Sequence, residues 1–73
     1  MIEVLVSDRL GKRLKVKCLE DDAVGDFKRV LAVQLSCQPG KIVLQKGGLV
    51  LKDHISLGDY EVHDGTHLEL YYS

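Results

Sequence analysis

The sequence lacks the features that mark a membrane, nucleic-acid-binding or large catalytic protein. No apolar run approaches the roughly 18 residues that a membrane span needs. Ten lysines and arginines are balanced by eleven aspartates and glutamates, and the net charge of −1 argues against nucleic-acid binding through bulk positive charge. The 73 residues have room for one small domain, 1–73, and are too few for most enzymes. We therefore expect a single cytosolic or nuclear domain that is not an enzyme and does not attach to a membrane.

Metal-binding and catalytic patterns are also missing. The chain has only two cysteines, Cys18 and Cys37, with no CxxC pair and no nearby histidine at zinc-finger spacing. The three histidines, His54, His63 and His67, do not form a helical i, i+4 pair, and we expect them to be solvated. No Ser-His-Asp spacing or phosphate-binding glycine loop is present. We expect buried, reduced thiols, no metal, no cofactor and no catalytic residue.

Two alternating segments open the chain. Apolar side chains recur at every second position in both segments, at Ile2, Val4 and Val6 and then at Leu14, Val16 and Cys18. Arg13, Lys15 and Lys17 fall on the opposite side of the second segment. The intervening Asp8-Arg9-Leu10-Gly11 is typical of a turn, so the pattern predicts a β-hairpin with one solvated face.

A helix is predicted after the acidic triplet Glu20-Asp21-Asp22. The apolar residues that follow have the spacing of one helical stripe, at Val24, Phe27, Leu31 and Leu35. Asp22 is a candidate residue for capping the helix start through its carboxylate. Pro39-Gly40 is expected to end the helical region.

The remaining segments predict three more strands and one short helical turn. Gly47-Gly48 separates strands over 42–46 and 49–51, residues 56–60 form the helical turn, and Asp64-Gly65 precedes a last strand in which Leu68 and Leu70 face inward. This order predicts an α+β fold in which one helix packs on a mixed five-stranded sheet. The first and last strands both have an apolar inner face, so we expect them to be central, adjacent and parallel.

This order of elements is that of ubiquitin, whose fold is the β-grasp. Short motifs along the whole chain resemble the Hub family of ubiquitin-like modifiers that act in pre-mRNA splicing. They are Met1-Ile2-Glu3-Val4, Asp8-Arg9-Leu10-Gly11-Lys12, Lys52-Asp53-His54, the segment 57–64 from Leu57-Gly58-Asp59-Tyr60 onward, and Leu68-Glu69-Leu70-Tyr71-Tyr72. The resemblance implies a ubiquitin-like modifier that binds a short helical motif in spliceosomal proteins and modulates splice-site usage.

The end of the sequence bears on how such a modifier would act. A conjugated ubiquitin-like protein needs a flexible tail ending in Gly-Gly, whereas this sequence ends in Tyr71-Tyr72-Ser73 directly after the last predicted strand. The internal Gly47-Gly48 is predicted to be a turn between strands. We therefore expect noncovalent binding, and a covalently attached protein tag is the alternative.

The surface that binds ubiquitin receptors is altered in this sequence. Alignment with ubiquitin places Arg9, Gln45 and Tyr71 at the three positions that form ubiquitin's apolar patch. Two of these three have lost their apolar character, and buried apolar area is what gives such a patch its affinity. We expect ordinary ubiquitin receptors to bind poorly.

The Hub resemblance instead implies a site around the helix start. There Asp22 pairs with an arginine of the partner's helical motif, and Leu19 with the aliphatic stems of Lys17 and Lys15 supplies apolar contact. Capping of the helix by Asp22 is the competing role, although the ubiquitin comparison puts Ala23 at the cap position. The implied partners are a spliceosomal tri-snRNP protein and a DEAD-box splicing helicase, bound by a monomer in the nucleus and cytoplasm.

A basic stripe, Lys12, Arg13, Lys15 and Lys17, leaves other interpretations open. A solvated strand face is the simplest, with Glu3 on the adjacent strand available to pair with one of the cations. Contact with an acidic partner and direct RNA binding are the alternatives. RNA binding is disfavoured because aromatic residues make up only 5% of the chain and none alternates with these cations to stack bases.

Overall fold

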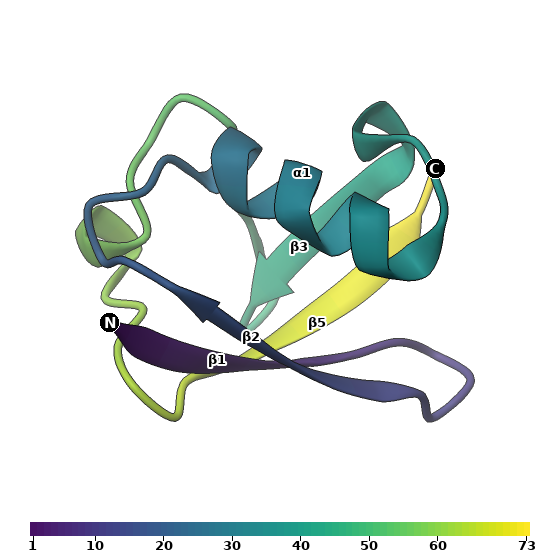
Figure 1. Ribbon diagram of the computed structural model, residues 1–73, viewed down its shortest axis with the longest axis horizontal. Coiled ribbons are helices and arrows are strands. Elements are labelled where there is room, and N and C mark those ends of the chain that lie inside the picture. Colours follow the sequence, from purple (N-terminus) through teal and green to yellow (C-terminus); the bar gives the residue numbers. More distant parts are fainter.

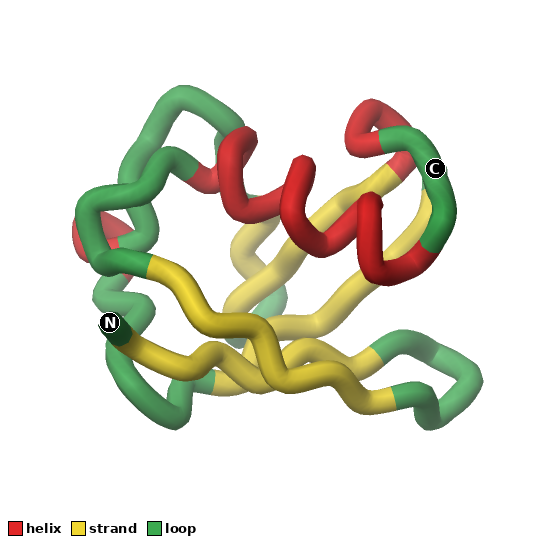
Figure 2. The backbone as a smooth tube through the Cα atoms, viewed as in Figure 1, coloured by secondary structure: helices red, strands yellow, loops and turns green.

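The computed structural model describes all 73 residues and contains five strands, one α-helix and two 3₁₀ turns (Figures 1 and 2). In chain order these are β1 (Ile2–Ser7), β2 (Arg13–Cys18), α1 (Val24–Leu35), η1 (Pro39–Lys41), β3 (Ile42–Lys46), β4 (Leu49–Val50), η2 (Gly58–Tyr60) and β5 (His67–Tyr72). The predicted order is confirmed, and η1 is an additional turn that the sequence analysis did not separate from the end of the helical region.

The five strands form one mixed sheet in the order β2-β1-β5-β3-β4. β1 and β5 pair in parallel at its centre, as the apolar inner faces of both strands predicted. β2 pairs antiparallel with β1, and β3 pairs antiparallel with both β5 and β4. This arrangement is the β-grasp fold, and it leaves β2 and the two-residue β4 as the edge strands.

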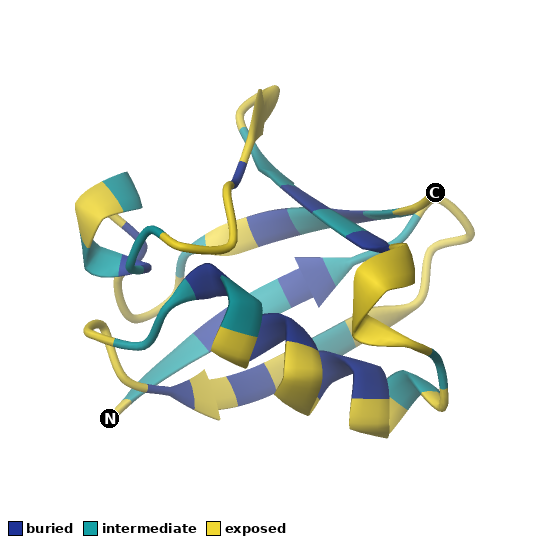
Figure 3. Cartoon of the chain, turned by 90° about the horizontal axis from the view of Figure 1, so that it is seen from above, coloured by how far each residue is buried: buried dark blue, intermediate teal, exposed yellow.

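The helix covers one face of the sheet and buries a single core between the two layers (Figure 1). Buried positions alternate with half-buried or exposed ones along the strands, as period-two side-chain geometry requires (Figure 3). Val24, Phe27 and Leu31 of the predicted helical stripe are buried, and Leu35 packs against the core from a half-buried position. Val62 is also fully buried, so it anchors the segment after η2 to the core.

The start of α1 is not capped by Asp22, which was the role that competed with partner binding, and the cap position is the one that the comparison with ubiquitin indicated. The N-cap residue is Ala23, and no side chain caps the first turn. Instead, the backbone N–H groups of Val24 and Gly25 donate to the carbonyl oxygens of Ile55 and Asp53, each at 2.9 Å. Because the loop before η2 satisfies these donors, which normally lack intrahelical partners, the helix does not need a capping carboxylate.

Candidate functional site

The Asp22 carboxylate forms a hydrogen bond within the loop between β2 and α1, to a residue near the start of that loop. Its Oδ2 accepts the backbone N–H of Leu19 at 2.9 Å, and the backbone N–H of Asp22 donates to the carbonyl oxygen of Leu19 at 3.1 Å. The other carboxylate oxygen, Oδ1, accepts no hydrogen bond from the chain and forms no ion pair. Leu19 beside it is 47% exposed. The loop therefore presents a fixed negative charge next to an exposed apolar side chain.

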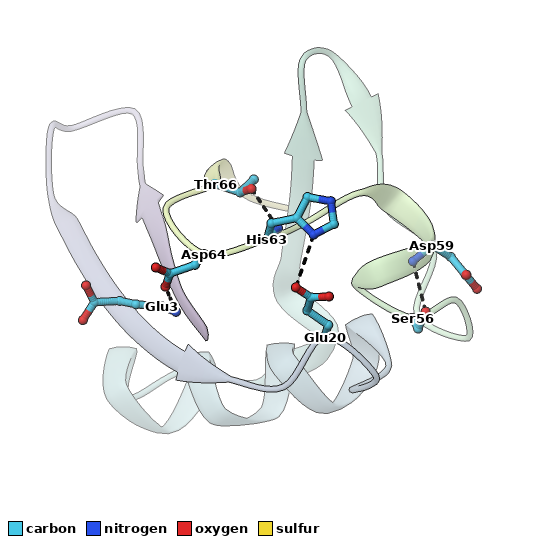
Figure 4. Close-up of polar contacts among 7 residues, drawn as sticks. All are labelled: Glu3, Glu20, Ser56, Asp59, His63, Asp64 and Thr66. Atoms are coloured by element: carbon cyan, nitrogen blue, oxygen red, sulfur yellow. Dashed lines mark hydrogen bonds and ion pairs between the residues drawn. The ribbon is translucent and has the colours of Figure 1, made fainter. Parts of the chain in front are cut away.

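The segment around η2 holds this loop in place. The N–H of Gly58 donates to the carbonyl oxygen of Glu20 at 2.8 Å, and the N–H of Leu57 donates to that of Asp22 at 2.9 Å. Figure 4 shows the ring of His63 facing the carboxylate of Glu20, with Nδ1 and Oε1 3.3 Å apart. A Cβ at Gly58 would lie 3.2 Å from the Glu20 carbonyl, so the close contact favours glycine there. The Asp22 loop is consequently pre-organised.

The three other predicted site residues lie along one row that leads to Asp22. Lys15, Lys17 and Leu19 occupy alternate positions on and just beyond the edge strand β2, and all three are exposed. Lys17 is the register partner of Glu3, but no ion pair forms between them, so the predicted cross-strand pair is absent. The structure thus brings the predicted residues to one edge of the sheet and leaves their charges unpaired within the chain.

The two cysteines are placed as the sequence indicated. Burial raises the pKa of the Cys18 thiol, the negative charge of Asp22 raises this pKa further, and the N-terminal amino group lowers it. Cys18 is therefore a protonated core residue at neutral pH, with little nucleophilic character. Cys37 is half-buried against the core, and neither cysteine forms a disulfide.

The face that corresponds to ubiquitin's apolar patch is polar here. The Arg9 guanidinium carbon lies 5.9 Å from the centroid of the Tyr71 ring, which is within range of a cation–π contact. The Tyr71 hydroxyl donates to Glu69 at 3.3 Å, and Gln45 pairs with Glu69 across the β3–β5 ladder. A cation, an amide and a hydrogen-bonded phenol do not offer the dry apolar surface of a ubiquitin-type patch.

The double tyrosine is part of the sheet. Tyr71 and Tyr72 pair with Val43 and Ile42 of β3, and the N–H of Ser73 donates to the carbonyl oxygen of Lys41 at 2.9 Å. The Gly47-Gly48 pair forms the β3–β4 turn with both residues at positive φ, as predicted.

One charged pair next to α1 was not anticipated from the sequence. Lys28 is buried and its Nζ contacts Asp53 Oδ1 at 2.6 Å, within a polar hollow of about 350 Å³ beside the first turn of α1. The signal was present, because Lys28 is four residues after Val24 and therefore lies on the buried stripe. No group of three or more His, Cys, Asp or Glu side chains is positioned to hold a metal ion. The single α-helix is not long and apolar enough to cross a membrane.

Comparison with known proteins gives full-length matches. The chain is 80% identical over 73 residues to "Ubiquitin-like modifier HUB1" of Candida glabrata, covering 100% of both chains. It is 74% identical over 72 residues to the Saccharomyces cerevisiae protein of the same name, covering 99% of each. A third relative, "Ubiquitin-like modifier hub1" of Schizosaccharomyces pombe, is 59% identical over 73 residues and is covered completely. No protein-family model matches the sequence.

Proposed function

The chain belongs to the Hub family of ubiquitin-like modifiers, a non-enzymatic family, and on that premise we propose that it modifies spliceosomal proteins by binding them noncovalently. In this proposal the domain docks onto a short helical motif of its partner in the nucleus or cytoplasm. Docking changes the position or activity of the partner, and through it pre-mRNA splicing and splice-site usage.

The geometry of Asp22 is the observation that supports this proposal most strongly. One carboxylate oxygen is held by the Leu19 N–H, and the other has no partner in the chain. An arginine of the partner's helix would donate charge-assisted hydrogen bonds to this carboxylate, each worth about 1.5 to 3 kcal/mol. The exposed Leu19 and the stems of Lys17 and Lys15 supply apolar contact for the same helix.

The proposed partners follow from the family resemblance. They are a tri-snRNP protein that contains the helical motif and a DEAD-box splicing helicase. Both would be bound by the same pre-organised loop, because its backbone is already fixed by Leu57 and Gly58 and loses little freedom on binding.

The placement of the double tyrosine supports a noncovalent mode. Tyr71 and Tyr72 are paired with β3, and the Gly47-Gly48 pair is enclosed in a turn. Neither segment resembles the flexible, side-chain-free tail through which ubiquitin-like proteins are conjugated.

Calorimetric titration with an arginine-containing helical peptide from the tri-snRNP partner tests the role of Asp22. The discriminating variant is Asp22→Asn, which keeps an oxygen for the Leu19 N–H but removes the charge. We expect its affinity to fall about tenfold or more, which corresponds to about 1.4 kcal/mol. Replacing the arginine of the peptide should lower wild-type affinity similarly and have little further effect in Asp22→Asn.

The matched control is Asp21→Asn, since Asp21 is an exposed neighbour that makes no hydrogen bond or ion pair. It should bind within about twofold of the wild type. Equal binding by the wild type and Asp22→Asn would exclude an Asp22-anchored site, and absence of binding by all three proteins would overturn the proposed helical partner.

A further inference from the structure

The hydrogen-bonding pattern of β1 shows which backbone groups of β2 are unpaired. The N–H of Leu5 donates to Thr66 at 2.9 Å and the carbonyl of Glu3 accepts from Gly65 at 2.8 Å, so the odd-numbered residues of β1 direct their backbone groups towards β5. The even-numbered residues of β1 therefore bond to β2. Their register partners are Leu14, Val16 and Cys18.

It follows that Arg13, Lys15 and Lys17 direct their backbone N–H and C=O groups away from the sheet, because these groups alternate in direction along a strand. β2 is an edge strand, and none of these groups forms a hydrogen bond elsewhere in the chain. We call this row of free backbone groups the β2 edge. Such a row can pair with an added strand.

The β2 edge ends at a defined point. Leu19 is the next residue with the same backbone direction, and both of its backbone groups are occupied by Asp22. The open length is therefore the five residues from Arg13 to Lys17. The other edge strand, β4, has only two residues, so it offers a much shorter template.

The side chains beside the β2 edge select the chemistry of an added strand. Arg13, Lys15 and Lys17 project on the solvent face of the sheet without ion-pair partners, whereas Leu14 and Val16 project on the helix face. A hollow of about 390 Å³ reaches from this edge across the sheet, and it is lined by Arg13, Leu14 and Lys15 of β2, Leu5 and Val6 of β1 and His67 of β5. Side chains of an added strand alternate between the same two faces.

We propose that the β2 edge binds an extended acidic segment of a partner protein by strand addition. Acidic and apolar residues alternate along this segment, so that the acidic ones lie beside the three cations on the solvent face and the apolar ones lie on the helix face. A second copy of this chain is a poorer occupant, because antiparallel or parallel pairing of two β2 edges brings lysines and arginine against one another. This inference shares Lys15 and Lys17 with the proposed helical-motif site, but it uses their backbone groups and charges rather than their aliphatic stems, and it makes no use of the Asp22 carboxylate.

Amide hydrogen exchange followed by NMR on the full chain, with a short peptide of alternating glutamate and valine, tests the proposal. We expect the N–H groups of Lys15 and Lys17 to become protected when the peptide binds, and those of Leu14 and Val16, already in the ladder, to change little. A peptide of alternating glutamine and valine should bind at least about tenfold more weakly at low salt. Protection at other amides, or none at all, would overturn strand addition at this edge.

Two variants separate backbone pairing from charge. Lys15→Pro removes one outward N–H while leaving the β1–β2 ladder bonds intact, and it should abolish binding. The doubly substituted Lys15→Glu, Lys17→Glu chain keeps the backbone, and it should reject the glutamate peptide and bind an alternating lysine–valine peptide instead. If the doubly substituted chain still binds the glutamate peptide, or does not bind the lysine–valine peptide, the proposal is contradicted even if the proline variant does not fold.

Two further arms distinguish this site from other functions. Asp22→Asn should bind the acidic peptide as the wild type does, so failure of the helical-motif proposal leaves this one standing and the reverse also holds. A single-stranded oligouridine should not compete with the peptide. Binding of the oligouridine to the wild type with no binding of the acidic peptide would assign the basic row to RNA and overturn the inference.

Discussion

The Asp22 carboxylate closes the end of the β2 edge rather than the end of α1. Both roles use the same carboxylate chemistry, but the helix donors are already satisfied by carbonyls of the loop before η2. Asp22 therefore bonds Leu19 through one oxygen, and its other oxygen has no hydrogen-bond partner within the chain. A residue that looks like a helix cap in the sequence thus becomes a candidate recognition residue.

The Lys28–Asp53 pair is the ion pair whose loss should cost most. The Lys28 side chain is only 11% exposed and Asp53 is 67% exposed, so removing the carboxylate leaves a nearly buried ammonium without its partner. We expect Asp53→Ala to lower the free energy of unfolding by about 1 to 2 kcal/mol, measured by urea denaturation. The cost is smaller than for a fully buried pair because solvent screens the exposed Asp53 carboxylate.

Asp26→Ala is the control for that measurement. The Asp26–Arg29 pair is exposed on both sides, at 61% and 75%, and its loss should change stability by about 0.5 kcal/mol or less. If Asp53→Ala costs no more than Asp26→Ala, the buried pair does not stabilise the fold as argued. Lys28→Met, which removes the charge and keeps the packing, should stay near wild-type stability.

At the scale of elements, the start of α1 depends on a distant loop. The carbonyl oxygens of Ile55 and Asp53 accept the N–H groups of Val24 and Gly25. A side-chain cap at position 23 can therefore accept only from an N–H group of the first turn that still lacks a partner. Ala23→Ser should therefore raise the free energy of unfolding by only about 0.5 kcal/mol, the low end for a new cap.

Urea denaturation of Ala23→Ser beside the wild type measures this difference. A gain approaching about 2 kcal/mol would mean that the first turn lacks backbone partners in solution, contrary to the structure. Ala23 has an extended backbone, with φ of −68° and ψ of 149°, so serine fits there without a change of conformation.

Periodicity was sufficient to predict the five strands, the long helix and the central pairing of the first and last strands. Val4 and Val6 alternate in the first strand as Leu68 and Leu70 do in the last, so both strands are central. The contacts of Asp22 were not predictable in this way. The loop around Leu19 and Asp22 is held by Leu57 and Gly58, more than thirty positions along the chain, and no local pattern reports such a contact.

For the candidate site, the structure shows where the predicted residues lie, and their role in binding stays a prediction. The resemblance identified Asp22, Leu19, Lys17 and Lys15, and the structure places them along one edge of the sheet. The direction of the β2 backbone groups was not accessible from the sequence, because it depends on which residues of β1 pair with β5.

At the scale of the whole molecule, a compact domain of 26 × 23 × 21 Å presents distinct surfaces on a rigid core. The Asp22 loop and the β2 edge lie at one side of the sheet, and the polar face of Arg9 and Tyr71 replaces ubiquitin's apolar patch. The first two surfaces are those proposed to dock protein segments, and the third lacks the apolar area of a ubiquitin-type patch.

The central claim is that this modifier acts on its partners without a covalent bond. The most direct measurement is purification of the tagged chain from cells that express it, once in native buffer and once after boiling in detergent and reductant, followed by mass spectrometry. We predict that spliceosomal proteins accompany the chain in native buffer and that only the free chain remains after boiling. Higher-mass species that survive boiling and contain peptides joined to the chain would contradict the account.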